Sequence, residues 1–123
     1  MINVVVTKYD DALNRLPDPI LKIEIKGHAG SGPYGHDLAC AAVSAIIVGT
    51  ANQIEEYANQ NEKQFNIEIK EGYAVIEVNK DNVNPCYLDP IYYSFNLALT
   101  QLKTIQASYP KLINIKEEKT TKF

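Results

Sequence analysis

The sequence has few cysteines and no cluster of basic residues. Cys40 and Cys86 are the only cysteines among 123 residues. Two cysteines in segments of different kinds do not make a disulfide framework, and unpaired thiols are typical of a reducing compartment. The formal net charge is −3, and no run of Lys or Arg forms the basic surface typical of nucleic-acid-binding domains. We therefore expect a cytoplasmic protein without direct nucleic-acid contact.

Long apolar runs and interdomain linkers are also absent. No apolar stretch approaches the roughly 20 residues that a membrane span needs, and the first residues do not follow the pattern of a signal peptide. The sequence has no repeat and no low-complexity segment. Because 123 residues with 46% hydrophobic content suit one core and not two, we expect a single domain over residues 1–123 and no membrane partner.

Two common ligand-binding motifs are missing. No Gly-Lys-Ser or Gly-Lys-Thr follows the glycines at 27–35, so the phosphate-binding loop pattern is not present. Residues 28–40 include His, Asp and Cys, which are metal-ligand types. Their spacing matches no common zinc pattern, and there is no CxxC pair. We expect neither a metal nor a cofactor.

Hydrophobic periodicity predicts two hairpins and two helices. Strands are predicted at 2–6, 21–25, 65–70 and 73–78, with a fifth candidate at 112–115. Helices are predicted at 38–57 and from Asp89-Pro90 to Tyr109, with Asp89 as N-cap. We expect residues 116–123 to be frayed. The order ββαββα(β) predicts an α+β layered domain, in which an antiparallel or mixed sheet packs against two helices in a strand order that the pattern does not reveal.

The segment from Gly27 to Ser44 concentrates the reactive groups. It holds both histidines, Cys40 and four of the six glycines. Asp37 is a good N-cap for the following helix, which places Cys40 in the first helical turn. There the unpaired amides and the helix dipole favour a thiolate and an oxyanion. The alternative is that Cys40 is a small buried hydrophobic residue.

His28 and its neighbours are candidates for supporting roles. A His at the end of a strand, close to a helix that carries a Cys, can accept the thiol proton. The alternative is a loop histidine with an ordinary hydrogen bond, and His36 is either the base or a surface residue. Asp37 is an N-cap or orients an imidazole. Ser44 lies one turn after Cys40. It either forms a hydrogen bond near the thiol or is simply a small residue that fits a closely packed helix.

The combined motif resembles the ribosomal-processing cysteine protease family Prp. The matching residues are Gly27-His28-Ala29, Tyr34-Gly35-His36-Asp37, Cys40-Ala41 and Ser44, and length and layout agree over nearly the whole chain. The resemblance implies a bacterial cytoplasmic cysteine endopeptidase. Such enzymes remove the N-terminal extension of a large-subunit ribosomal protein precursor during ribosome assembly, and they are typically homodimers.

The resemblance also implies residue roles. Cys40 is the implied nucleophile and His28 the general base, with Asp37 and Ser44 in support. A loop implied to move over a hydrophobic, aromatic-containing substrate segment comprises Gly30, Ser31, Gly32, Tyr34 and Gly35. The competing hypothesis is a non-catalytic ribosome-assembly or precursor-binding factor on the same fold.

Overall fold

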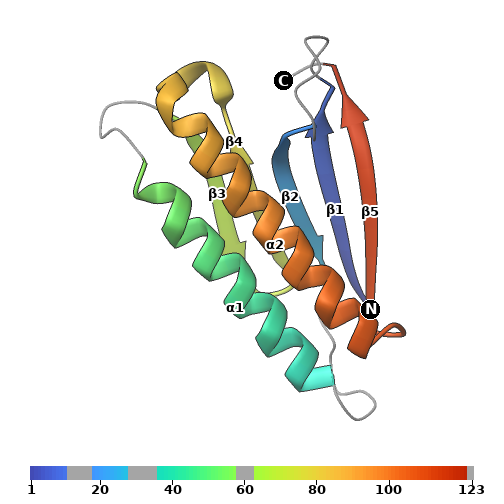
Figure 1. Ribbon diagram of the computed structural model, residues 1–123. Coiled ribbons are helices and arrows are strands. Elements are labelled where there is room, and N and C mark those ends of the chain that lie inside the picture. The colour runs from blue at the N-terminus through green and yellow to red at the C-terminus, as the bar shows by residue number, and fades with distance from the viewer. Residues whose placement is uncertain (11–17, 28–35, 58–62, 122–123) are drawn as a thin grey trace.

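The computed structural model describes residues 1–10, 18–27, 36–57 and 63–121. Two helices lie side by side across one face of a sheet (Figure 1). The elements are β1 (Ile2–Tyr9), β2 (Ile20–Lys26), α1 (His36–Glu55), β3 (Phe65–Lys70), β4 (Tyr73–Val78), 3-10 turns at Lys80–Asn82 and Pro85–Tyr87, α2 (Leu88–Ser108) and β5 (Ile113–Thr120). The predicted α+β fold with two helices on a sheet is confirmed.

The sheet has five strands in the order β3-β4-β2-β1-β5. β1 and β2 are antiparallel, as the predicted first hairpin requires, and β3 and β4 form the second hairpin. β5 pairs in parallel with β1 over the whole length of both strands. The sheet is therefore mixed, and α2 supplies the crossover to the parallel strand.

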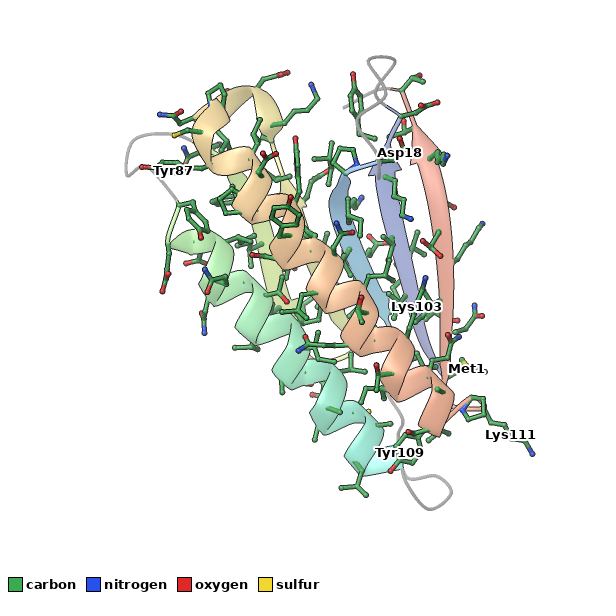
Figure 2. All side chains as sticks on the ribbon, in the orientation of Figure 1. Met1, Asp18, Tyr87, Lys103, Tyr109 and Lys111 are labelled. Atoms are coloured by element: carbon green, nitrogen blue, oxygen red, sulfur yellow. The ribbon has the colours of Figure 1, made fainter. Side chains whose placement is uncertain are left out.

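The expectation that the chain is frayed from residue 116 onward is wrong as far as Thr120. β5 continues that far because each of its residues has a partner on β1. Glu117 also forms ion pairs with Lys8 at 2.7 Å and with Lys103 at 3.3 Å. Lys103 lies on α2 and extends toward the sheet (Figure 2). The polar local sequence concealed this strand because its stabilising partners are distant in the chain.

The core lies between the sheet and the two helices. Alternate residues of the strands face the helices, as the period of two predicted. Both helices add apolar side chains from one side. Fully buried residues of this core include Val4, Val6, Ile20, Ile23, Ile54, Ile76, Ile91, Phe95 and Leu102.

The helix starts differ from the predicted ones. α1 begins at His36, so Asp37 is inside the helix and is not its N-cap. The N-cap of α2 is Tyr87, without a side-chain cap hydrogen bond, and Asp89 lies in the first turn. Both predictions placed the start two residues too late, because capping residues are also favourable in the first helical turn.

α1 is unusually apolar for a helix on a protein surface. Residues Leu38–Glu55 have a mean hydropathy of 1.4, and 33% of this segment is buried. Within the described residues, this is one helix whose length and composition would suffice to cross a membrane. A core helix of a soluble protein has the same properties, and α1 packs its buried side, which includes Val43, Ile47 and Ile54, against the sheet and α2.

Candidate active site

A cavity of about 210 Å³ lies between the first half of α1 and the adjoining end of the sheet. Mainly apolar residues from several elements line it. Its described lining residues are Ile2, Ile25, Gly27, Cys40, Val43, Ser44, Ile47, Ile69, Lys70, Glu71, Gly72, Tyr73 and Ala74. The cavity is thus bordered by a thiol and a hydroxyl on one side and by the β3–β4 hairpin on the other.

Cys40 and Ser44 both reach this cavity from α1. They are four residues apart, so they project from the same side of the helix, as predicted. Cys40 is half-buried and is a thiol rather than part of a disulfide. This placement leaves the sulfur accessible to a ligand, as a reactive cysteine requires.

The electrostatic setting of Cys40 differs from the prediction. With α1 starting at His36, Cys40 is the fifth helical residue rather than the third. The α-helical pattern assigns its N–H to the carbonyl of His36, so the unpaired amides are those of the preceding residues. Because the helix dipole acts mainly within the first turn, its effect on this thiol is smaller than the sequence suggested.

The end of β2 is held against the β3–β4 turn beside the cavity. The Gly27 N–H donates to the Gly72 carbonyl at 2.9 Å. Gly27 has φ of 87°, and a Cβ at this position would lie 2.4 Å from the Met1 carbonyl oxygen. Any side chain is therefore strained here twice, by backbone conformation and by contact. Gly27 sets the point at which the chain leaves the sheet toward His28.

A polar cluster borders the hairpin on the sheet face away from the helices. The Tyr73 hydroxyl donates to a Glu24 carboxylate oxygen at 3.0 Å. This hydrogen bond raises the pKa of Tyr73, with burial adding to the same effect. The Lys70 ammonium lies 5.5 Å from the centre of the Tyr73 ring. These contacts stabilise the hairpin end that forms one wall of the cavity.

Several predicted site residues fall outside the described residues. These are His28 and the whole set Gly30, Ser31, Gly32, Tyr34 and Gly35. His36 and Asp37 are placed in α1, but their side chains are not described. The structure therefore brings Cys40 and Ser44 together and leaves the roles assigned to the other residues as predictions.

The part of the β3–β4 hairpin from Ile69 to Ala74 was not predicted to belong to the site. Glu71-Gly72 was interpreted only as a turn, and Ile69 only as part of a half-buried strand. In the structure both line the same cavity as Cys40. The sequence contained one signal for this wall. Ile69 is the last apolar residue before a tight turn, and a side chain at a hairpin end has few neighbours that cover it.

A cysteine at an apolar cavity on an α+β sheet fits a thiol-dependent hydrolase, and comparisons with known proteins define which one. The family model described as cysteine protease Prp matches residues 1–114. The chain therefore belongs to the cysteine protease Prp family, and it is a cysteine protease.

Individual relatives agree with this membership. The ribosomal processing cysteine protease Prp of Mycoplasma pneumoniae is 29% identical over 98 residues, which cover 80% of this chain and 88% of that protein. The Mycoplasma genitalium protein of the same name is 33% identical over 93 residues, covering 76% and 84%. The crystal structure of the S. aureus ribosomal processing protease Prp with a substrate peptide shares the fold, with a TM-score of 0.71, 23% identity and coverage of 96% and 100%.

Proposed function

We propose that this chain, as a single domain over residues 1–123, removes the N-terminal extension of a large-subunit ribosomal protein precursor. Cys40 is the nucleophile and His28 the general base in this proposal. The observation that carries it is that Cys40 lines an apolar cavity in a member of the Prp family. Relatives named ribosomal processing cysteine protease support the choice of substrate.

The chemistry needs one proton acceptor and one thiol. His28 takes the thiol proton, and the Cys40 sulfur attacks the scissile carbonyl carbon to form a tetrahedral intermediate. N–H groups in the first turn of α1 stabilise its oxyanion. When the C–N bond breaks, His28 returns the proton to the leaving amine. The shortened protein leaves as this amine, and water then hydrolyses the thioester, which releases the extension as a carboxylic acid and restores the thiol.

The cavity that Cys40 lines is a binding pocket for an apolar substrate side chain next to the scissile bond. Its floor consists of helix-facing sheet residues, among them Ile25 and Ala74, and its roof includes Val43 and Ile47 from α1. Burial of an apolar side chain contributes about 1.5–3 kcal/mol. That binding energy positions the adjacent carbonyl near the thiol.

The test is cleavage of a peptide that spans the precursor extension under reducing conditions. We expect the wild type to cut once and the Cys40→Ala variant to leave the peptide intact. Cys86→Ala is the matched control, since Cys86 is an exposed thiol outside the cavity lining, and it should cleave normally. Binding of the peptide without cleavage by the wild type would instead support a non-catalytic precursor-binding factor.

We also propose that the protein is a homodimer in the bacterial cytoplasm, where ribosomes assemble. The outer sides of α1 and α2 expose large apolar residues, including Leu38, Val48, Tyr93 and Leu97. A groove between the helices is lined by Ala45, Gly49 and Leu97, among others. Exposed apolar surfaces of this kind are typical of interfaces. Leu97→Glu should convert the dimer to a monomer in light scattering, whereas a wild type that is monomeric at all concentrations would refute the assembly.

A further inference from the structure

β3 is an edge strand whose exposed backbone leads to the cavity of Cys40. In the described part of the chain it pairs with β4 alone. Its last residues, Ile69 and Lys70, line the cavity, while its first residues, Phe65 to Ile67, line a second hollow at the opposite end of the strand. β3 therefore runs from the second hollow to the cavity that Cys40 lines.

The hydrogen-bond register defines which backbone groups of β3 face outward. Lys70 and Tyr73 flank the two-residue turn, and they form a hydrogen-bonded pair in such hairpins. Two backbone hydrogen bonds agree with this alternation, because the Gly27 N–H donates to the Gly72 carbonyl and the Asn79 N–H donates to the Gln64 carbonyl.

Lys70 and every second residue before it therefore bond to β4. The N–H and C=O groups of the intervening residues point away from the sheet, and these residues are Phe65, Ile67 and Ile69.

The side chains along this edge suit an extended, partly apolar peptide. Ile69 is 45% exposed although it is a large apolar residue that borders the cavity. Ile67, two residues earlier, lies on the same helix-facing side and is half-buried. Glu68 and Lys70 alternate with them on the other side, where they form an ion pair at 3.0 Å. The strand thus offers an apolar side and a polar side to a partner strand.

We propose that the substrate peptide binds as an additional strand on the β3 edge. Its backbone bonds to the outward groups of Ile67 and Ile69, and its apolar side chains cover Ile69 and enter the cavity at Cys40. This inference rests on the proposed protease function, because a peptide that Cys40 cuts must lie within reach of this edge. Strand addition holds the peptide extended, with the scissile bond presented to the thiol.

The decisive experiment is a scan of N-methylated substrate peptides with the wild-type enzyme. Each peptide carries one N-methyl group at a different backbone amide, with the scissile amide left unmodified. We expect kcat/KM to fall at least about 10-fold at every second position near the cut and to change little at the positions between, since lost strand hydrogen bonds recur with a period of two. Uniform small effects with efficient cleavage of every peptide would overturn the proposal.

The unmodified peptide separates this proposal from the function on which it rests. Without cleavage of that peptide, the protease assignment to this substrate fails before strand addition is tested. With cleavage, the pattern of the scan concerns strand addition alone. The two failures are therefore distinguishable.

Hydrogen exchange gives a second measurement that does not depend on turnover. The Cys40→Ala variant, mixed with the unmodified peptide at saturation, should exchange the amides of Ile67 and Ile69 more slowly than without peptide. Amides of β5, the other edge strand, serve as the internal control and should not change. Slower amide exchange on β5 but not on β3 would contradict the proposal. Slower exchange on β3 without peptide, at higher protein concentration, would also contradict it, because it would indicate that a second copy of the chain binds this edge.

Discussion

The two edges of the sheet, β5 and β3, make different contacts with the rest of the molecule. At the β5 edge, Glu117 is joined to β1 and α2 through Lys8 and Lys103, and Lys119 reaches Asp18 at 3.0 Å. At the β3 edge, the ion pair of Lys70 with Glu68 stays within the strand, and Ile69 is exposed beside the cavity of Cys40. Both are edge strands, but β5 is joined to neighbouring elements by these ion pairs, whereas β3 has an exposed apolar residue next to a nucleophile and can accept a substrate strand.

The largest expected difference concerns a core residue of β5 and an exposed residue of β3. Ile113 is 1% exposed, so Ile113→Ala should lower the free energy of unfolding by about 2–5 kcal/mol. Ile69→Ala should lower it by about 1 kcal/mol or less, because Ile69 is 45% exposed. Chemical denaturation measures both. Equal losses would show that β3 contributes to the core as β5 does.

The next prediction concerns proline substitutions within β3. The N–H of Glu68 bonds to β4, whereas that of Ile69 faces outward, so Glu68→Pro should cost about 1–3 kcal/mol more stability than Ile69→Pro. Ile69→Pro should also impair peptide cleavage, and Ile69→Thr, which keeps the N–H, should impair it much less. A reversed order of the two proline variants in denaturation would disprove the register assigned to this edge.

Gly27, at the end of β2, and Gly49, in α1, should respond to Ala substitution with opposite changes in stability. Gly27→Ala should destabilise by about 1–3 kcal/mol, since it combines positive φ with a contact to the Met1 carbonyl. Gly49→Ala is the control: a Cβ there would have nothing within 4 Å, so the change should stabilise α1 by about 0.5–1 kcal/mol. Thermal unfolding gives both signs, and a neutral Gly27→Ala would argue against a fixed chain exit at this point.

The smallest effect is expected from the ion pairs of the β5 edge. The hydrogen bond from Lys8 and that from Lys103 lower the pKa of Glu117, although burial opposes them. A lowered pKa contributes stability above the usual pKa of Glu and loses it as pH falls through the folded-state value. Glu117→Gln should therefore reduce the melting temperature slightly at neutral pH and not at about pH 3. A difference that persists in acid would exclude the charge as its cause.

Local patterns predicted most of the fold correctly. Alternation in Leu21–Ile25 and Phe65–Lys70 identified strands, and Glu71-Gly72 identified their turn. The errors lie where distant partners decide: β5 extends to Thr120 through β1, Lys8 and Lys103. The start of α1 was also misplaced, because local sequence hardly distinguishes an N-cap from a first-turn residue.

The candidate site was predicted in part. Cys40 and Ser44 were expected on one side of a helix, and they line one cavity. The helix-facing wall at Ile69 to Ala74 was not foreseen, because nothing local in a hairpin indicates which helix will lie across it. The role of His28 stays a prediction based on the family motif.

The sequence by itself determined the element types, the helix that carries Cys40 and the family of the chain, because periodicity and motif are local properties. Only the tertiary structure decided that the β3–β4 hairpin lines the cavity of Cys40, that β5 forms the opposite edge of the sheet and that Ile69 is exposed at the cavity. These facts depend on strand order, which is set by burial of the whole sheet against two helices and is not encoded in any single segment.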